Sequence, residues 1–283
     1  MGIGLPDTAA QEAIREVPHF RDSGYAGLDI AGTLRFYRDR YVRPFLSQVA
    51  LNSTATVLDV GAGYGWLSIA LTGEIGCRVI AVDFDGARLR AAQMIADILG
   101  VASRIDFATA SVGALPLPDE SVDVTFCIEV LEHVQRDPSA PRNLARVTKG
   151  HIVLTTPNRW FPVIAHDTRL PLCHWLPMPL RQGYARIFGR TDRENDNLFW
   201  SAPQLERGLR GFTRSSRWMH YPSLQDFLDT YPHYMPFQGG KWVDRLPALR
   251  KAYYRLASPL GSSSRYVLPT LAGLYSRAER AAR

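Results

Sequence analysis

Asp59-Val60-Gly61-Ala62-Gly63-Tyr64-Gly65 begins with the last two residues of a short run rich in β-branched residues, Thr56–Val60. It ends just before a helical pattern, Trp66–Ile75. Glycines at the carboxyl end of a strand let the backbone approach a ligand closely, and the N–H groups of the following helix attract an anionic group. A dinucleotide fingerprint, G-x-G-x-x-G, requires glycine at the position of Trp66. The spacing therefore predicts a cofactor loop and disfavours a nicotinamide dinucleotide.

Strand and helix patterns alternate outward from this loop. Further strands are expected at Arg78–Val82, Arg104–Ala108, Val122–Ile128 and His151–Thr155, with helices between them. A sixth strand is expected at Phe212–His220 and an antiparallel last strand at Tyr266–Tyr275. Regular βα alternation is typical of a parallel sheet covered on both faces. The predicted fold is α/β: a Rossmann-like, doubly wound, mostly parallel sheet of seven strands, the last one antiparallel, with helical and irregular insertions.

The rest of the chain divides around this core. Residues 1–50 are expected to form an N-terminal helical cap, in which Pro44 should kink or break a helix over Thr33–Ala50. Residues 51–158 are expected to form the cofactor-binding core. Residues 159–200, rich in Pro, Trp, His and Arg, are expected to form an insertion that covers the substrate. Residues 201–283 complete the core and carry a basic insertion at 222–265.

Composition narrows the class of protein. The chain of 283 residues is 46% hydrophobic and 21% charged, and its apolar runs are too short to cross a bilayer. Three widely spaced cysteines, Cys77, Cys127 and Cys173, indicate neither a disulfide framework nor a zinc site. With no signal-peptide pattern at the N-terminus, a cytoplasmic protein is expected.

Charge is distributed unevenly along the chain. Residues 159–283 hold 19 Lys and Arg against 9 Asp and Glu, a net charge of +10, whereas the remainder has a net charge of −4. A basic half can attract an anionic substrate, a lipid surface or nucleic acid. Solvated arginines on helix faces would give the same composition.

The second strand ends in a carboxylate and an aromatic ring. Asp83 lies 20 residues beyond Gly63, where a carboxylate can accept both ribose hydroxyls of an adenosine. The ring of Phe84 can lie against the adenine face. Asp83 could instead merely end the strand, with Phe84 filling the core.

Together these motifs resemble the class I S-adenosylmethionine (SAM)-dependent methyltransferases. The resemblance runs from about Thr56 to Asn158. It includes the linker Ala114–Asp123, the segment Glu129-Val130-Leu131-Glu132-His133, as in the quinone-biosynthesis-like branch of small-molecule O-methyltransferases, and Thr156-Pro157-Asn158. It implies SAM as the cofactor, held by Asp59, Gly61, Ala62, Gly63, Asp83, Phe84, Ser111, Val112, Cys127 and Glu129. Ser111 departs from the family, which usually has Asp there, and a neutral partner gives the adenine amino group a weaker hydrogen bond.

Methyl transfer to a hydroxyl also needs a base. The resemblance places His133 at the methyl end of the cofactor, so His133 is the first candidate, with His166, Asp167 and His174 as further candidates. A helix-start histidine with a purely structural hydrogen bond is the alternative. Glu129, Glu132 and His133 could instead bind a divalent cation, but without a further ligand cluster no metal is expected.

The insertion 159–200 is expected to be a mobile lid that orders when the acceptor binds. Its aromatic residues could form a wall around an apolar or ring-bearing acceptor, or a small core of the insertion itself; they are Trp160, Phe161, Trp175, Phe199 and Trp200. The expected partner is a small-molecule acceptor, anionic or aromatic, methylated at a hydroxyl oxygen. Two alternatives stay open: a lipid-linked or glycan acceptor at a membrane surface, and a non-catalytic SAM-binding protein.

Two other functions fit the sequence poorly. An NAD(P) oxidoreductase conflicts with Trp66 and lacks a Tyr-x-x-x-Lys pair. Nucleic-acid methylation would use the basic half, but the chain has no Asn-Pro-Pro-Tyr-type motif after the fourth strand and no Pro-Cys nucleophile. No nucleic-acid partner is therefore expected.

Overall fold

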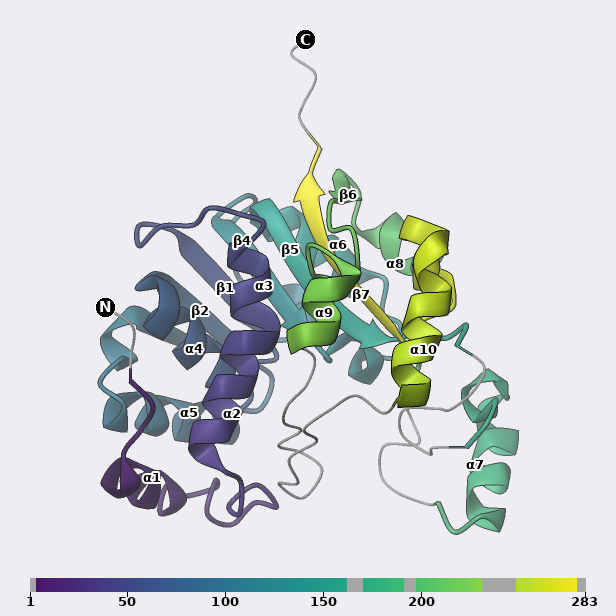
Figure 1. Cartoon of the computed structure of the whole chain (residues 1–283). Coiled ribbons are helices and arrows are strands. Elements are labelled where there is room, and N and C mark those ends of the chain that lie inside the picture. Colours follow the sequence, from purple (N-terminus) through teal and green to yellow (C-terminus); the bar gives the residue numbers. More distant parts are fainter. Residues whose placement is uncertain (1–3, 162–169, 191–196, 231–247, 279–283) are drawn as a thin grey trace.

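A seven-stranded sheet forms the centre of the computed structural model, with strand order β3-β2-β1-β4-β5-β7-β6 (Figure 1). The structure describes residues 4–161, 170–190, 197–230 and 248–278. The strands are β1 (Thr56–Val60), β2 (Arg78–Asp83), β3 (Ile105–Thr109), β4 (Val122–Ile128), β5 (Thr148–Pro157), β6 (Phe212–Arg214) and β7 (Thr270–Arg277). β1 to β5 pair in parallel, and β7 runs antiparallel to both β5 and β6. The predicted Rossmann-like fold is confirmed.

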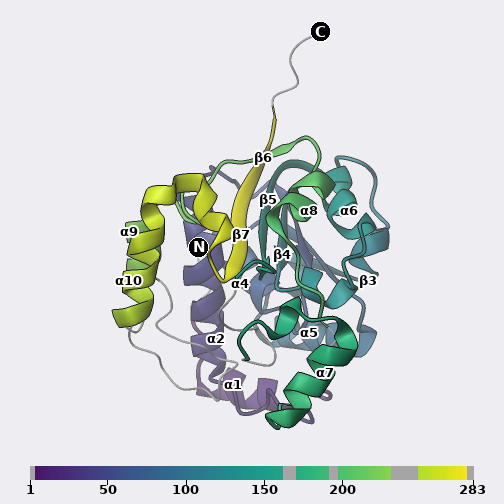
Figure 2. The same cartoon turned by 90° about the vertical axis from the view of Figure 1, so that its right-hand side faces the viewer.

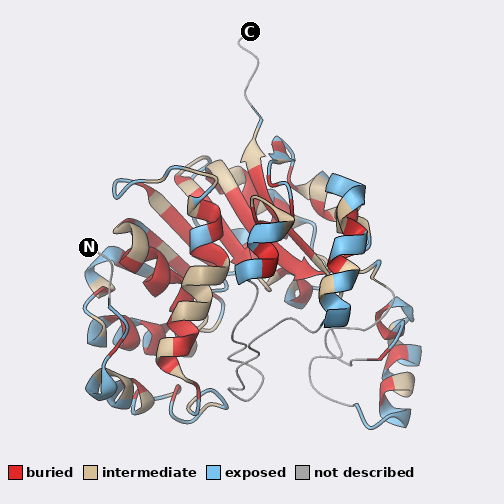
Figure 3. Ribbon diagram, in the orientation of Figure 1, coloured by how far each residue is buried: buried red, intermediate tan, exposed pale blue. Residues whose placement is uncertain are grey.

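Helices cover both faces of the sheet (Figures 1 and 2). They are α1 (Thr8–Arg15), α2 (Ile30–Tyr37), α3 (Arg43–Leu46), α4 (Trp66–Ile75), α5 (Gly86–Ile98), α6 (Ser139–Val147), α7 (Met178–Ile187), α8 (Ala202–Gly208), α9 (Leu224–Thr230) and α10 (Ala248–Ala257). Neighbouring residues of β1 show how the faces separate: Val57 packs in the core beneath α2, α4 and α5, and Leu58 in the core beneath α6 and α8. This two-residue period produces the buried middle layer in Figure 3.

A third, smaller core lies against β7. Trp218, Phe227 of α9 and Tyr254 of α10 pack there around Leu268 and Ala272. The described part of the basic insertion, 222–265, therefore has apolar packing of its own against the edge of the sheet.

The N-terminal helix runs from Ile30 to Leu46 rather than over Thr33–Ala50, and Pro44 does not break it. A π-helical turn, Arg38–Val42, joins α2 to α3 immediately before Pro44. Proline has no N–H to donate to the carbonyl four residues earlier, that of Arg40. Nε2 of His220 donates to this carbonyl at 2.8 Å, so a side chain distant in the sequence supplies a hydrogen bond at the distortion.

Two strand boundaries, the end of β6 and the start of β7, differ most from the prediction. β6 ends at Arg214 instead of continuing to His220, because the hydroxyl of Ser216 accepts the Leu274 N–H at 3.1 Å in place of a strand carbonyl. β7 begins at Thr270 rather than Tyr266, since Ser258–Tyr266 is 3₁₀-helical and Pro269 precedes the strand. Both differences depend on side-chain hydrogen bonds and turns that hydrophobic periodicity does not report.

Candidate functional site

The carboxyl ends of β1, β2 and β4 lie at one edge of the sheet, the lower edge in Figure 1. The strand order reverses between β1 and β4, and ligands of open α/β sheets bind at such a switch point. Gly61, Asp83 and Glu129 each follow or end one of these three strands. The topology therefore brings together three of the residues predicted to bind the cofactor.

The glycine loop is shaped by close contact with the loop after β4. Gly61 has φ +72°, and a Cβ at this position would lie 2.2 Å from Cγ2 of Val130. The amides of Gly61 and Ala62 both donate to the carbonyl of Val82, at 2.7 and 3.0 Å. These contacts hold the loop close to the end of β2, and no side chain fits at Gly61.

Asp83 fixes the other side of the loop. Its Oδ2 accepts the Gly63 amide at 2.8 Å and its Oδ1 accepts the Asp85 amide at 2.9 Å. The side chain is buried, yet each carboxylate oxygen has further acceptor capacity for ribose hydroxyls. The ring of Phe84 is 78% exposed, so it does not fill the core and is available to lie against a base.

Asp59 is a buried carboxyl behind the loop. Its Oδ2 accepts the hydroxyl of Ser68, on α4, at 2.6 Å. Burial raises the pKa of Asp59 to about 7, and the nearby charge of Asp83 acts in the same direction. Asp59 therefore changes charge near neutrality, and a cation bound beside it would favour the ionised form.

The remaining predicted cofactor residues differ in exposure. Ser111 is exposed and caps the 3₁₀ turn Val112–Ala114, where its Oγ accepts the Gly113 amide at 3.2 Å. The side chains of Val112 and Cys127 are buried in the core beneath α6 and α8. Burial raises the pKa of the Cys127 thiol well above its usual value. A contact between Cys127 and a cofactor would therefore have to come from its backbone.

Two glutamates follow β4. Glu129 has a left-handed backbone, φ +54°, which is unusual for a residue other than glycine and concentrates at functional sites. Glu132 is fully buried, and its Oε2 accepts the hydroxyl of Thr156 at 3.0 Å. Burial and the neighbouring Glu129 raise the pKa of Glu132 well above its usual value. Within the described residues no group of three His, Cys, Asp or Glu side chains is arranged to hold a metal ion.

His133 is exposed and held by one hydrogen bond. Its Nδ1 lies 3.0 Å from Oδ1 of Asn197. An amide oxygen only accepts, so Nδ1 carries the proton and Nε2 keeps a free lone pair. Asn197 is in turn held by Nη1 of the buried Arg181, on α7, which donates to the backbone carbonyl of Asn197. In the neutral imidazole this arrangement makes Nε2 the nitrogen that can accept a proton.

Of the other catalytic candidates, His174 lies within the described part of the chain. His166 and Asp167 lie outside the described residues. His174 is buried, and its Nε2 lies 3.0 Å from the carbonyl oxygen of Arg159. This contact links His174 to the segment that follows β5.

Three arginines, Arg136, Arg159 and Arg181, lie close enough together for their charges to interact. Nε of Arg136 donates to the carbonyl of Phe199 at 3.0 Å, and the amide of Arg159 donates to the carbonyl of Trp200 at 2.9 Å. Burial and the charges of Arg159 and Arg181 lower the pKa of Arg136. Clustered cations of this kind favour an anion among them.

The predicted aromatic wall is divided. Phe199 and Trp200 are buried, and Nε1 of Trp200 donates to the carbonyl of Leu131 at 2.8 Å. Trp160 and Trp175 remain 44% and 48% exposed. Phe161 is half-buried, with its ring edge-on to that of Tyr253, so Trp160 and Trp175 are the most exposed rings of the predicted wall.

The N-terminal cap contributes aromatic side chains that were not among the predicted site residues. Tyr37, at the end of α2, is half-buried; burial and the nearby Tyr41, Asp59 and Glu129 raise its pKa. The Tyr64 hydroxyl lies 3.0 Å from Nδ1 of His19. Tyr37 belongs to the apolar face of the expected Thr33–Ala50 helix, and this pattern does not distinguish a core tyrosine from one beside a cofactor.

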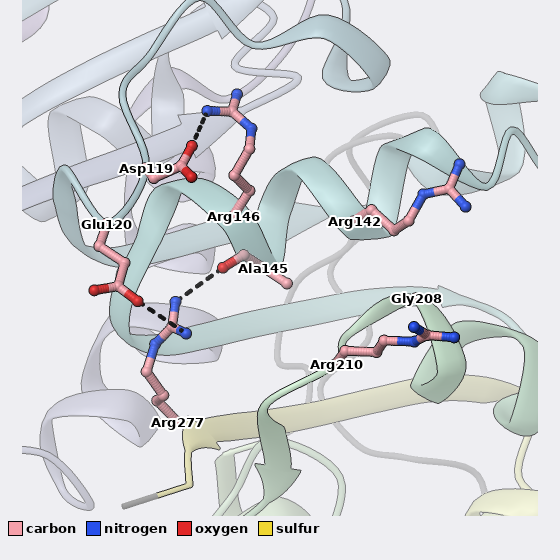
Figure 4. Close-up of a pocket in the computed structure, with 8 residues that line it drawn as sticks. All are labelled: Asp119, Glu120, Arg142, Ala145, Arg146, Gly208, Arg210 and Arg277. Carbon is pink, nitrogen blue, oxygen red and sulfur yellow. Dashed lines mark hydrogen bonds and ion pairs between the residues drawn. The ribbon is translucent and has the colours of Figure 1, made fainter. Parts of the chain in front are cut away.

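A cavity of about 270 Å³ lies away from this site (Figure 4). It is lined by Asp119, Glu120, Arg142, Ala145, Arg146, Gly208, Arg210 and Arg277. Asp119 pairs with Arg146 at 2.8 Å and Glu120 with Arg277 at 3.3 Å. Because Glu120 precedes β4 and Arg277 ends the antiparallel β7, the cavity lies at the amino edge of the parallel strands, opposite the predicted cofactor loop.

Comparison with known proteins agrees with the geometry of the site. Residues 58–154 match the model of a family described as a methyltransferase domain. An uncharacterized methyltransferase of Mycolicibacterium paratuberculosis is 31% identical over 192 residues, which cover 61% of this chain and 72% of that protein. A Mycobacterium tuberculosis protein, described as a probable S-adenosylmethionine-dependent methyltransferase, is 34% identical over 105 residues, 36% of each chain.

The fold is also shared with a solved enzyme. The structure of a geranyl diphosphate methyltransferase in complex with SAM aligns with a TM-score of 0.53 at 14% identity. The alignment covers 99% of this chain and 97% of that one.

Proposed function

Because this chain belongs to the methyltransferase family, we propose that it transfers the methyl group of SAM to a hydroxyl oxygen of a small acceptor that carries an anionic group. The observation that carries the proposal is the hydrogen bond between His133 and Asn197, which leaves Nε2 of His133 free to accept a proton. It lies after β4, on the same edge of the sheet as the glycine loop.

The residues at that edge suit the cofactor. Gly61 leaves room for close backbone approach, the oxygens of Asp83 can take the ribose hydroxyls, and the exposed ring of Phe84 can cover the adenine. When bound, SAM supplies an activated methyl group on a sulfonium, so covalent catalysis by the protein is not needed. What the chain must add is alignment of the acceptor and removal of its proton.

His133 serves as the base. Its neutral imidazole accepts the hydroxyl proton at Nε2. The hydrogen bond that Nδ1–H donates to Asn197 then stabilises the resulting imidazolium. Arg136 and Arg159 attract the anionic group of the acceptor, and Trp160 and Trp175 offer ring faces to an aromatic acceptor. These residues favour a hydroxylated aromatic acid over an uncharged acceptor.

The direct test is methyl transfer from isotopically labelled SAM to matched acceptors. A phenol bearing a carboxylate, the same phenol without it, and an aromatic amine are compared, and the methylated atom is located by mass spectrometry. We expect methylation of the phenolic oxygen, with the carboxylated phenol preferred. Arg136→Gln should raise KM for the carboxylated phenol and leave that of the uncharged phenol unchanged. SAM binding without transfer to any acceptor would instead identify a non-catalytic SAM-binding protein.

A further inference from the structure

Two segments of the basic half expose large apolar side chains. Segment 172–190 exposes Leu172, Trp175, Leu176, Leu180, Ile187 and Phe188, and segment 249–267 exposes Leu249, Leu256, Leu260 and Val267. Single exposed apolar residues are ordinary, but a concentration of them marks an interaction surface. The two segments contain α7 and α10, which lie on the same side of the molecule, toward the viewer in Figure 2.

On α7 the apolar stripe faces outward. Leu180 and Ile187, spaced i and i+7, lie on one face of the helix, and Phe188 follows its last residue. Leu180 is 62% exposed and Ile187 80% exposed. The same helix buries Arg181, whose Nη1 donates to the carbonyl of Asn197. α7 is therefore held by Arg181 and by the packing of Ala185 and Tyr184 in a small core with Leu170, Cys173 and Phe199, and it leaves Leu180 and Ile187 exposed.

On α10 the arrangement is similar. Leu249 and Leu256, spaced i, i+7, are 85% and 79% exposed, with the exposed Ala252 between them. Tyr254 and Ala257, on another face of the helix, pack in the small core against β7. Both helices thus keep a leucine-containing stripe outside the packing that holds them in place.

Within the two segments themselves the charge has one sign. Residues 171–190 contain three arginines and residues 248–267 contain three arginines and one lysine, with no Asp or Glu in either range. Arg186 and Arg255 are exposed and flank the two stripes. Apolar side chains bordered by basic ones are typical of helices that lie in the interface of an anionic membrane. A second copy of this chain would bring the same positive charge against itself, which disfavours a dimer.

We propose that the face formed by α7 and α10 docks on an anionic lipid membrane, with the two leucine stripes entering the headgroup region and the arginines contacting lipid phosphates. Among the described residues there is no helix that could span a bilayer. Through Arg181 and Asn197, α7 is connected to His133, and the docked face therefore adjoins the acceptor side of the site. The surface goes beyond the proposed methyl transfer, which does not require it.

Co-sedimentation with lipid vesicles, without SAM, tests the proposal. The wild-type chain should pellet with vesicles of phosphatidylcholine and phosphatidylglycerol, and much less with phosphatidylcholine alone or at high salt. Leu180→Glu with Ile187→Glu, and separately Leu249→Glu with Leu256→Glu, should each lower the partition coefficient roughly tenfold or more. Arg186→Gln with Arg255→Gln should reduce binding to the anionic vesicles.

Met94→Glu is the matched control, since Met94 is 44% exposed on α5 and outside the proposed surface, so the variant should bind vesicles as the wild type does. SAM binding, measured on every variant, separates loss of docking from loss of folding or of the proposed function. Equal vesicle binding by the wild type and both double glutamate variants would overturn the proposal. So would a wild-type dimer that fails to bind vesicles and becomes monomeric in those variants, because the surface would then be an interface between copies.

Discussion

Gly61 and Val130 are in direct contact across the switch point of the sheet: a Cβ on Gly61 would come within 2.2 Å of Cγ2 of Val130. Gly61 belongs to the loop after β1 and Val130 to the loop after β4. The absence of one side chain therefore sets how closely the two loops that enclose the proposed SAM site approach one another.

Gly61→Ala should disrupt SAM binding. Alanine at φ +72° is strained, and valine is stiff at χ1, so the loop must move. Calorimetric titration should show SAM affinity reduced at least tenfold, with partial recovery in Gly61→Ala/Val130→Ala. Gly100→Ala is the matched control: Gly100 has φ +70° with no heavy atom within 4 Å of an added Cβ, so this variant should lose about 1 kcal/mol of stability but no affinity. Equal affinity in the Gly61 and Gly100 variants would contradict the proposed role of the contact.

Asp83→Ala should weaken SAM binding by about 1.5–3 kcal/mol, roughly 10- to 150-fold in Kd, because hydrogen bonds to a charged group are lost. The neighbouring Asp85 caps α5 through its side chain, and Asp85→Ala should cost about 1 kcal/mol of stability while leaving Kd nearly unchanged. Titration calorimetry and urea unfolding separate the two effects. Near-wild-type affinity in Asp83→Ala would mean that the ribose lies elsewhere.

His133→Ala should lower kcat by about 10²–10⁴-fold with SAM affinity nearly unchanged. Asn197→Ala should lower kcat less, since the base remains but its tautomer is no longer fixed. Full activity in His133→Ala would mean that another group removes the proton, or that the acceptor is already ionised and has no proton to lose.

His220 should make the fold sensitive to mild acid. Burial lowers the pKa of His220 to about 3, with its Nε2 on the carbonyl of Arg40. The folded chain thus keeps this imidazole neutral while the unfolded chain protonates it below about pH 6.5. Stability from His220 is therefore complete above that pH and is lost as pH falls toward the folded value.

Between pH 7 and pH 5 this loss amounts to about 2 kcal/mol of unfolding free energy. His220→Gln keeps a donor for the Arg40 carbonyl but does not titrate. Urea unfolding should show the variant gaining on the wild type by that amount as pH falls. A difference between the two proteins that is the same at pH 5 and pH 7 would show that His220 does not titrate on unfolding in this range.

Strands β1 to β5 and the glycine loop could be predicted because their signals are local. Thr56–Val60 is β-branched and apolar, and the glycines that follow it mark the turn. Strand β6 could not be delimited in the same way, since its end depends on the Ser216 hydroxyl meeting the Leu274 amide across 58 residues. Hydrophobic periodicity does not report a hydrogen bond between a side chain and a distant backbone amide.

The site shows the same division. The roles of Gly61 and Asp83 follow from their positions after β1 and at the end of β2, whereas the state of His133 depends on Asn197, 64 residues away. Tyr37 lies beside the site only because α2 packs on α4, and its place on an apolar helix face predicts burial alone. The roles of His133 and Tyr37 depend on tertiary contacts, which a sequence motif does not show.

Calorimetric titration of the purified chain with SAM, S-adenosylhomocysteine and NADH tests the central claim most directly. The glycine loop, Asp83 and Phe84 predict that SAM and S-adenosylhomocysteine bind at one site and raise the melting temperature, as any ligand specific for the folded state does. NADH should give neither heat nor a shift, because Trp66 occupies the position that a dinucleotide fingerprint reserves for glycine. Binding of NADH together with no binding of SAM would contradict the account.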